Sequence, residues 1–220
     1  MRKSLTGQLL VASTTVTDPM YANSVCLVVH EDETRVIGVI LNRPIEPNSE
    51  ALRTILGETD LSIPRSPSNR FSAGEMPEGL TTHGSESASP HSCQGLSPPT
   101  RSLHFGGPLS GPIVALHQAS YYAEAETGDG IYVAAQKDHL LELIRSQNEP
   151  CRLIVGHLGW NAEELEAEIE GGIWHPVPAS VDDVFSPARE MWPGIIRRAT
   201  STSLAKWIGL PDANAVGELN

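Results

Sequence analysis

Arg35-Val-Ile-Gly-Val-Ile-Leu-Asn-Arg-Pro44 is the stretch of sequence around which the fold is expected to form. Its part from 36 to 41 is a nearly continuous aliphatic run rich in β-branched residues, the pattern of a strand buried on both faces. Gly38 interrupts the run, and a glycine inside a strand often marks a bulge or a close approach of a neighbouring segment. Pro44 ends the strand because proline has no backbone N–H to give to a sheet. The stretch therefore predicts a central strand with the polar pair Asn42-Arg43 at its end.

A second apolar run precedes this strand. It extends from Ser24 to His30, and only a short acidic loop, residues 31–34, separates the two runs. The two strands are therefore expected to pair as an antiparallel hairpin. Elsewhere the periodicity predicts further strands and helices. The strands are expected at 7–12, 112–117, 131–134, 151–156 and 173–178, and the helices at 50–57, 137–147, 161–170 and 181–185.

The length of 220 residues suits a single domain, which we expect to span 1–220 and to bury its own core without a metal or disulfide. Half of the residues from 62 to 102 are Ser, Pro or Gly. Such a composition buries too little surface to offset the entropy of ordering it, so we expect an irregular, mobile insertion there. From about residue 186 the pattern predicts a helical tail, with segments at 195–199 and 204–208 and with Pro193 at a first-turn position.

The charge of the chain restricts its partners. Fifteen Lys and Arg residues against 27 Asp and Glu residues give a formal net charge of −12, which disfavours nucleic acid and anionic lipid as partners. The sequence has no apolar run of about 18 residues, so no membrane span is expected. Polar residues 6–8 interrupt the N-terminal apolar segment, which argues against a signal peptide. A cytoplasmic protein is the prediction.

The cysteines and histidines suggest no metal site or disulfide. Cys26, Cys93 and Cys151 are odd in number and form no C-x-x-C pair, which is typical of reduced thiols in a cytosolic protein. Cys26 and Cys151 lie in aliphatic runs and are expected to be buried and unreactive, whereas Cys93 is expected to be accessible. The eight histidines show no metal-ligand spacing, so we expect neither a metal nor a cofactor.

Strand ends and glycine turns are where a sheet exposes backbone to a ligand. Gly106-Gly107 could offer free amides to an anion, and Gly159-Trp160 precede a predicted helix N-terminus. If the sheet brings them to Arg43, a shallow pocket for a small anion or a carboxylate-bearing peptide results. In the alternative, Trp160 is part of the core, Arg43 pairs with an acid and the glycines only turn the chain. The candidate ligand-binding residues are Asn42, Arg43, His104, Gly106, Gly107, Gly159 and Trp160.

Several motifs together resemble one family. They are Gly38-Val-Ile-Leu-Asn-Arg-Pro44, Phe105-Gly-Gly-Pro108, Gly156-His-Leu-Gly-Trp160 and Trp174, and in this order they are similar to the YqgE/AlgH family of small bacterial proteins (UPF0301, DUF179). The resemblance implies an α+β fold with a bent mixed β-sheet, partly closed into a small barrel and flanked by helices. It implies no established activity, although some members have been called transcriptional regulators. The long segment 62–102 and the divergent tail depart from the family pattern.

Three classes of function follow. The preferred one is a non-catalytic binding or regulatory domain that recognises a small anion, a carboxylate ligand or a protein partner. A hydrolase-like enzyme using the Asn42/Arg43/His104 region is an alternative, although no nucleophile elbow, Cys/His pair or carboxylate pair is present and the catalytic residues are unknown. A transcriptional regulator is the third, and the acidic charge and the lack of a basic recognition helix argue against it. The oligomeric state is left open.

Overall fold

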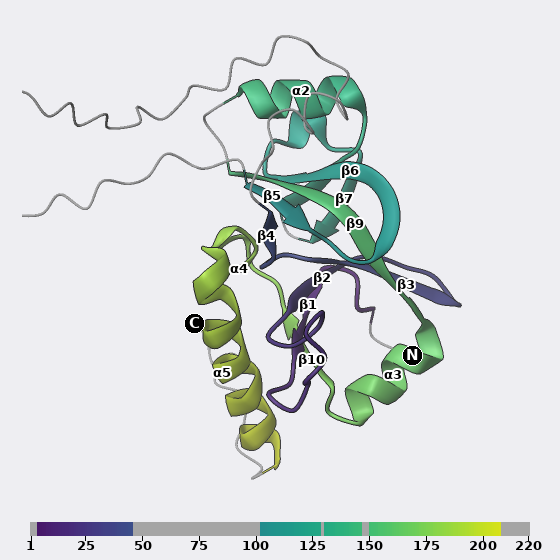
Figure 1. The fold of residues 1–220 in the computed structure, drawn as a ribbon, viewed down its shortest axis with the longest axis vertical. Helices are drawn as coiled ribbons and strands as arrows, with labels where there is room; N and C mark the ends of the chain where they lie inside the picture. Colours follow the sequence, from purple (N-terminus) through teal and green to yellow (C-terminus); the bar gives the residue numbers. More distant parts are fainter. Residues whose placement is uncertain (1–3, 46–101, 129, 147–149, 208–220) are drawn as a thin grey trace, which may run out of the picture. The chain divides into compact units, whose positions relative to one another are not determined.

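The computed structural model describes residues 4–45, 102–128, 130–146 and 150–207 (Figure 1). The predicted helix at 50–57, the predicted insertion up to residue 101, and Cys93 lie outside the described residues. Ser102, which the sequence placed at the end of the insertion, is the first residue of a strand.

The described residues form ten strands, four α-helices and one 3-10 helix. In chain order they are β1 (Gln8–Ala12), β2 (Val25–Glu31), β3 (Arg35–Ile40), β4 (Pro44–Ile45), β5 (Ser102–Phe105), β6 (Leu109–His117), η1 (Ser120–Tyr122), β7 (Ala125–Gly128), β8 (Ile131–Ala134), α2 (Lys137–Arg145), β9 (Cys151–Asn161), α3 (Ala162–Glu170), β10 (Trp174–Pro178), α4 (Val181–Phe185) and α5 (Ala188–Trp207).

The strands form one curled sheet in the order β10-β1-β2-β3-β9-β6-β8-β7, and β5 adds to β9 with β4 at its side. The hairpin predicted from the two apolar runs is confirmed, because β2 and β3 pair antiparallel with Leu27 opposite Val39. The register shifts between Val28 and His30, close to Gly38, as the glycine suggested. The sheet is mixed because β5 runs parallel to β9, whereas the other pairs are antiparallel.

The curled sheet returns toward its own start at Gly7. This residue has a φ of +77°, and a Cβ atom built on it would lie 2.0 Å from the carbonyl oxygen of Thr127 in β7. The Gly7 amide also donates to the Val28 carbonyl oxygen at 2.9 Å. Only glycine permits this approach, which brings β7 beside the residues preceding β1. The predicted fold class, a bent mixed sheet partly closed into a barrel and flanked by helices, is confirmed.

The central strands are buried on both faces, as the aliphatic runs predicted. In β2, Val25 and Leu27 pack into one hydrophobic cluster, and Cys26 and Val28 pack into the other. This alternation follows from the two-residue period of a strand. The first cluster is closed by α4 and α5, and the second includes residues of α3. Each fully buried Leu or Val contributes about 1.5–3 kcal/mol of hydrophobic stabilisation.

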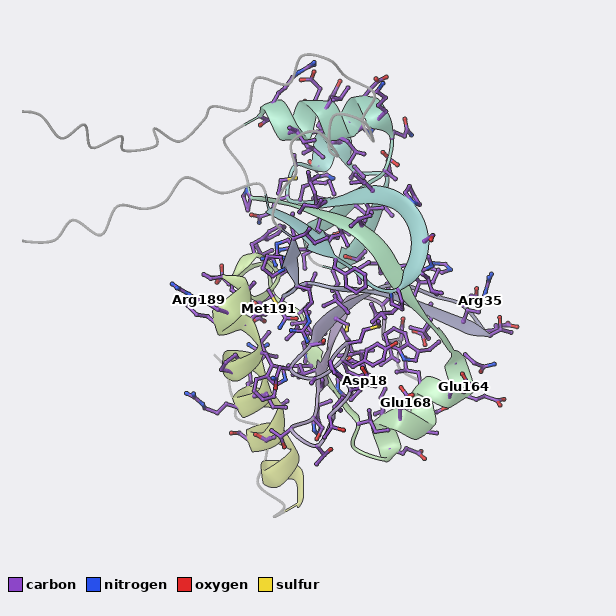
Figure 2. All side chains as sticks on the ribbon, in the orientation of Figure 1. Asp18, Arg35, Glu164, Glu168, Arg189 and Met191 are labelled. Carbon is purple, nitrogen blue, oxygen red and sulfur yellow. The ribbon has the colours of Figure 1, made fainter. Side chains whose placement is uncertain are left out.

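Helix α5 corrects the predicted tail. The sequence suggested two segments with Pro193 in a first turn, but one helix runs from Ala188 to Trp207 with Pro193 inside it. The apolar residues Met191 and Ile195 lie on both sides of the proline and are both buried, so packing on β1 and β10 overrides the helix-breaking tendency. Figure 2 shows Met191 on the side of α5 toward the sheet and Arg189 on the outer side.

The remaining helices agree with the predictions. In α2 the buried residues are Leu140, Leu141 and Leu143, which gives the expected amphipathic face. The side chain of Asn161 caps α3 by accepting from the Glu163 amide at 3.0 Å. Ser180 and Asp183 form a reciprocal capping box at the start of α4. Within the described residues, no helix combines the length and the apolar character that crossing a membrane requires.

Candidate functional site

The glycines of the Phe105-Gly-Gly-Pro108 motif lie where the chain crosses over β9. Val155 of β9 pairs with Phe105 of β5 and also with Ile113 of β6. A strand residue has one neighbour on each edge, so β5 and β6 lie on opposite edges of β9. The segment between β5 and β6 must therefore pass over the backbone of β9.

The crossing leaves no room for side chains. A Cβ atom on Gly107 would lie 2.3 Å from the His157 carbonyl oxygen, and one on Gly156 would lie 2.3 Å from the Gly107 carbonyl oxygen. Gly156 also has a φ of +78°, a left-handed conformation that favours glycine. These glycines are thus required by the contact between two backbones.

The Gly106 backbone is already used at the crossing. Its amide donates to the Val155 carbonyl oxygen at 2.8 Å, and its carbonyl oxygen accepts from the Ile40 amide at 2.8 Å. The predicted anion nest needs a free Gly106 amide. In the structure this amide is instead hydrogen-bonded to the Val155 carbonyl oxygen. Beside the crossing is a cleft of about 280 Å³ without a charged lining residue, formed by Phe105, Gly107, Pro108, Leu109, Ser110, Gly111, Val155 and Gly156.

Trp160 and Gly159 belong to β9 and lie apart from Arg43. Trp160 pairs with Val36, and its ring carbon Cζ3 would be 3.0 Å from a Cβ atom on Gly38. The indole makes an edge-to-face contact with Trp174 at a centroid distance of 5.9 Å. Trp160 therefore packs with the cluster near α3, as the alternative for this residue held, and it lines neither described cleft.

His104 is buried in β5, with 2% of its surface exposed. Burial, and then the nearby charge of Arg152, lower the pKa of His104 to about 3, and a hydrogen bond with the Leu41 backbone opposes this shift. The imidazole is therefore neutral at pH 7. It lines neither of the two described clefts, although β5 pairs it with Pro44, which lines the cleft of Arg43.

Asn42 and Arg43 line a larger cleft, of about 510 Å³, between the end of β3 and the start of α5. Its lining residues are Asn23, Asn42, Arg43, Pro44, Ala188, Arg189, Trp192 and Pro193. Two of these eight are arginines and none is acidic, in a chain with 27 acidic residues. The cleft is therefore locally basic on an acidic protein.

One wall of the cleft is held by side-chain hydrogen bonds to a loop. Asn42 accepts from the Val25 amide at 3.0 Å and donates to the Asn23 carbonyl oxygen at 2.7 Å. Asn23 itself is left-handed, with a φ of 59°. Arg43 donates through Nη2 to the Ala22 carbonyl oxygen and, at 3.4 Å, to the Ser24 hydroxyl. Both residues thus fix the loop before β2, and Arg43 pairs with backbone rather than with the expected acid.

The other wall is the first part of α5. The Trp192 indole is held by its Nε1, which donates to the Ala12 carbonyl oxygen at 2.9 Å. The Arg189 side chain is 87% exposed and forms a solvated contact of 3.4 Å with Glu190. Ala188 and Arg189 lie in the first turn, where backbone amides and the helix dipole favour a negative charge.

Arg152 of β9 was missed in the sequence. It is 5% exposed, and its guanidinium donates to the carbonyl oxygens of Leu41 and, at 2.8 Å, Ser186. Burial lowers the pKa of Arg152 to about 10, so it stays charged at pH 7. Leu41 leads into one wall of the cleft and Ser186 into the other. The only signal in the sequence was a lone cation inside the aliphatic run 151–155.

The cysteines differ from the prediction at one position. Cys26 is fully buried, as predicted, and burial raises the pKa of its thiol. Its low reactivity stays a prediction. Cys151 is only partly buried, because it is the first residue of β9. Within the described ranges, no three His, Cys, Asp or Glu side chains are arranged to hold a metal ion.

Comparisons with known proteins agree on one family. A family model described as AlgH-like, DUF179, matches residues 9–203. A UPF0301 protein of Thermobifida fusca is 30% identical over 199 residues, covering 90% of this chain and 88% of its own, and one from Stenotrophomonas maltophilia is 26% identical over 198 residues, covering 89% of each.

Solved structures show the same fold at lower sequence identity. A crystal structure from Corynebacterium diphtheriae has a TM-score of 0.60 at 19% identity, covering 90% of this chain and 88% of its own. The solution structure of the AlgH protein of Pseudomonas aeruginosa has a TM-score of 0.55 at 19% identity, covering 100% and 99%. At such identities the likeness concerns the fold.

Proposed function

The chain belongs to the AlgH-like (DUF179, UPF0301) family, and within that family we propose that it is a non-catalytic binding domain for a small anion. The ligand lies in the cleft between residues 42–44 and the first turns of α5. The observation that carries the proposal is the charge of this cleft. It has two arginines and no acid among its lining residues, on a protein with a net charge of −12.

The parts of the cleft have complementary roles in the proposal. Arg43 is held in place by Ala22 and Ser24, so one guanidinium is already oriented before the ligand arrives. Arg189 is long and exposed, and it closes over the anion as a second cation. Trp192, fixed by its bond to Ala12, forms an apolar wall for the body of the ligand. A carboxylate-bearing peptide or a small organic acid has this combination of charge and apolar body.

The proposal is tested by thermal shift with a panel of small anions at constant ionic strength. A ligand that binds the native state raises stability by about 2.7 kcal/mol at a hundredfold excess over Kd. We expect anions with an apolar body to raise Tm, and we expect Arg189→Ala and Arg43→Ala to remove the rise. If no anion raises Tm, or if both variants respond as the wild type does, the cleft is not the binding site.

Arg35→Ala is the matched control for these variants. It removes the same charge from an exposed arginine whose partner is Asp32 at 3.8 Å. Figure 2 shows Arg35 near the tip of the β2–β3 hairpin, far from Arg189 at the start of α5. Loss of the shift in all three variants would indicate a general effect of net charge. Retention of the shift in Arg35→Ala alone supports the cleft as the binding site.

A cytoplasmic location of the protein remains a prediction.

A further inference from the structure

Among the residues that the structure describes, Arg152 is a buried cation without an acidic partner. Its two hydrogen bonds go to carbonyl oxygens, and no carboxylate in the described part of the chain forms an ion pair with it. Buried charges in proteins are ordinarily paired, because desolvation of an unpaired ion is costly. A chain with 27 acidic residues has ample material for such a pair. The missing partner therefore needs an explanation outside simple packing.

The position of Arg152 supplies one. Its guanidinium bonds to Leu41, directly before Asn42 and Arg43, and to Ser186, directly before the segment that opens α5. The charge thus contacts the two residues that lead into the two walls of the cleft. Arg152 is not a lining residue, so its effect on a ligand is through its field and through its hold on both walls. His104 beside it is neutral and does not alter this charge at pH 7.

We infer that the cleft prefers a doubly charged oxyanion, the phosphate group of a monoester, to a singly charged anion of the same shape. Arg152 is the positioning residue that provides the fixed charge behind the ligand. The inference rests on the proposed function and specifies its ligand. The attraction to a fixed charge is proportional to the charge of the ligand, so a dianion gains twice as much as a monoanion. Planar guanidinium groups also match the geometry of phosphate oxygens.

A pair of probes with one shape isolates the charge. Phenyl phosphate is mainly a dianion at pH 8, whereas phenyl sulfate is a monoanion, and both have a ring that fits beside Trp192. We expect phenyl phosphate to bind about tenfold more tightly, the effect of one additional unit charge about 12 Å from a fixed charge at an effective dielectric constant near 20. Lowering the pH to 5 protonates the phosphate once, because its second pKa is about 6, and should remove the preference.

Inorganic phosphate identifies the source of the phosphate group. Tighter binding of phenyl phosphate than of inorganic phosphate supports a monoester whose body lies against Trp192. Equal binding of the two supports free phosphate, with the same preference for a dianion. The affinities are measured by titration calorimetry at constant ionic strength.

Two substitutions test the role of Arg152 itself. Arg152→Met removes the charge with little change in length, and Arg152→Lys keeps the charge but loses the two-pronged contact. We expect the ratio of phenyl phosphate to phenyl sulfate affinity to fall several-fold in the Met variant, in which Arg43 and Arg189 still favour the dianion, and to persist in the Lys variant. A purely structural role would weaken both ligands together and leave the ratio unchanged, which would overturn the assignment of Arg152.

The wild-type protein decides the matter even if Arg152→Met does not fold. Equal affinity for the two phenyl esters at pH 8 overturns the inference and leaves the proposed anion site intact. If neither ester nor any other anion binds, the proposed function itself is wrong. A preference for phenyl phosphate that disappears at pH 5, together with its persistence in Arg152→Lys, supports both.

Discussion

Two regions of the molecule contain the stretches on which the family resemblance rests, and they use their residues in different ways. At the crossing over β9, Gly106, Gly107 and Gly156 are needed because two backbones touch. At the cleft, Asn42 and Arg43 hold a loop and also face open space. A motif of glycines can thus be fully explained by the fold, whereas a motif of polar residues at a strand end can serve the fold and a ligand together.

The largest expected effect is at the crossing. Gly156→Ala adds a Cβ atom 2.3 Å from the Gly107 carbonyl oxygen, at a left-handed backbone position. Neither backbone can move without breaking β9 from β5 or β6, so we expect a loss of about 3 kcal/mol or more in the free energy of unfolding. Urea denaturation followed by circular dichroism measures it.

Gly194→Ala is the control for this substitution. Gly194 lies in α5, and a Cβ atom there meets nothing within 4 Å. Alanine in a helix interior is about 0.5–1 kcal/mol more favourable than glycine, so this variant should be slightly more stable than the wild type. A loss of stability at Gly156 no larger than the change at Gly194 would show that the crossing is looser than described.

The next effect is in the wall of the cleft. Asn42→Ala removes the acceptor for the Val25 amide and the donor to the Asn23 carbonyl oxygen. Two lost hydrogen bonds at a buried position should lower stability by about 2–3 kcal/mol. Asn42→Asp keeps the acceptor and loses the donor, so it should fall between alanine and the wild type. An alanine variant as stable as the wild type would mean that the side chain of Asn42 does not support the loop.

The sequence predicted the fold better than the site, for reasons visible in particular residues. Hydrophobic runs such as 36–41 report burial directly, so the hairpin and the central strands were correct. The crossing depends on β5 and β6 pairing with opposite edges of one strand, and that non-local fact is absent from local patterns. Arg152 was missed for the same reason, because its partners are more than 30 residues away along the chain.

An effect of pH is expected from the region between the crossing and the cleft. The pKa of His104 is about 3 in the folded protein and about 6.5 when unfolded. Below pH 6.5 the unfolded chain therefore binds a proton that the folded chain does not. The free energy of unfolding then decreases as the pH is lowered, by up to about 1.4 kcal/mol per pH unit. Above pH 6.5 this contribution to the pH dependence is absent.

His104→Gln tests this origin of the acid sensitivity. The variant should lose less stability than the wild type between pH 6.5 and pH 4, although its stability at pH 7 is lower because a buried ring is replaced. Buried His117, whose pKa is also lowered by desolvation, contributes in the same direction in both proteins and cancels in the difference. Parallel stability curves for the two proteins would assign the pH dependence to other groups.

The smallest effect on stability is expected from the residue with the most ligand-specific role. Arg189 is exposed, and its contact with Glu190 is a solvated pair, so Arg189→Ala should change the free energy of unfolding by less than about 0.5 kcal/mol. Asn42→Ala, on the opposite wall, should lower it several times more. Arg35→Ala should have an equally small effect on stability. It should leave the anion-induced rise in Tm intact, whereas Arg189→Ala should remove this rise. An Arg189→Ala protein that is strongly destabilised would place this arginine with Asn42 as a support of the fold, and the cleft would then lack a residue committed to the ligand alone.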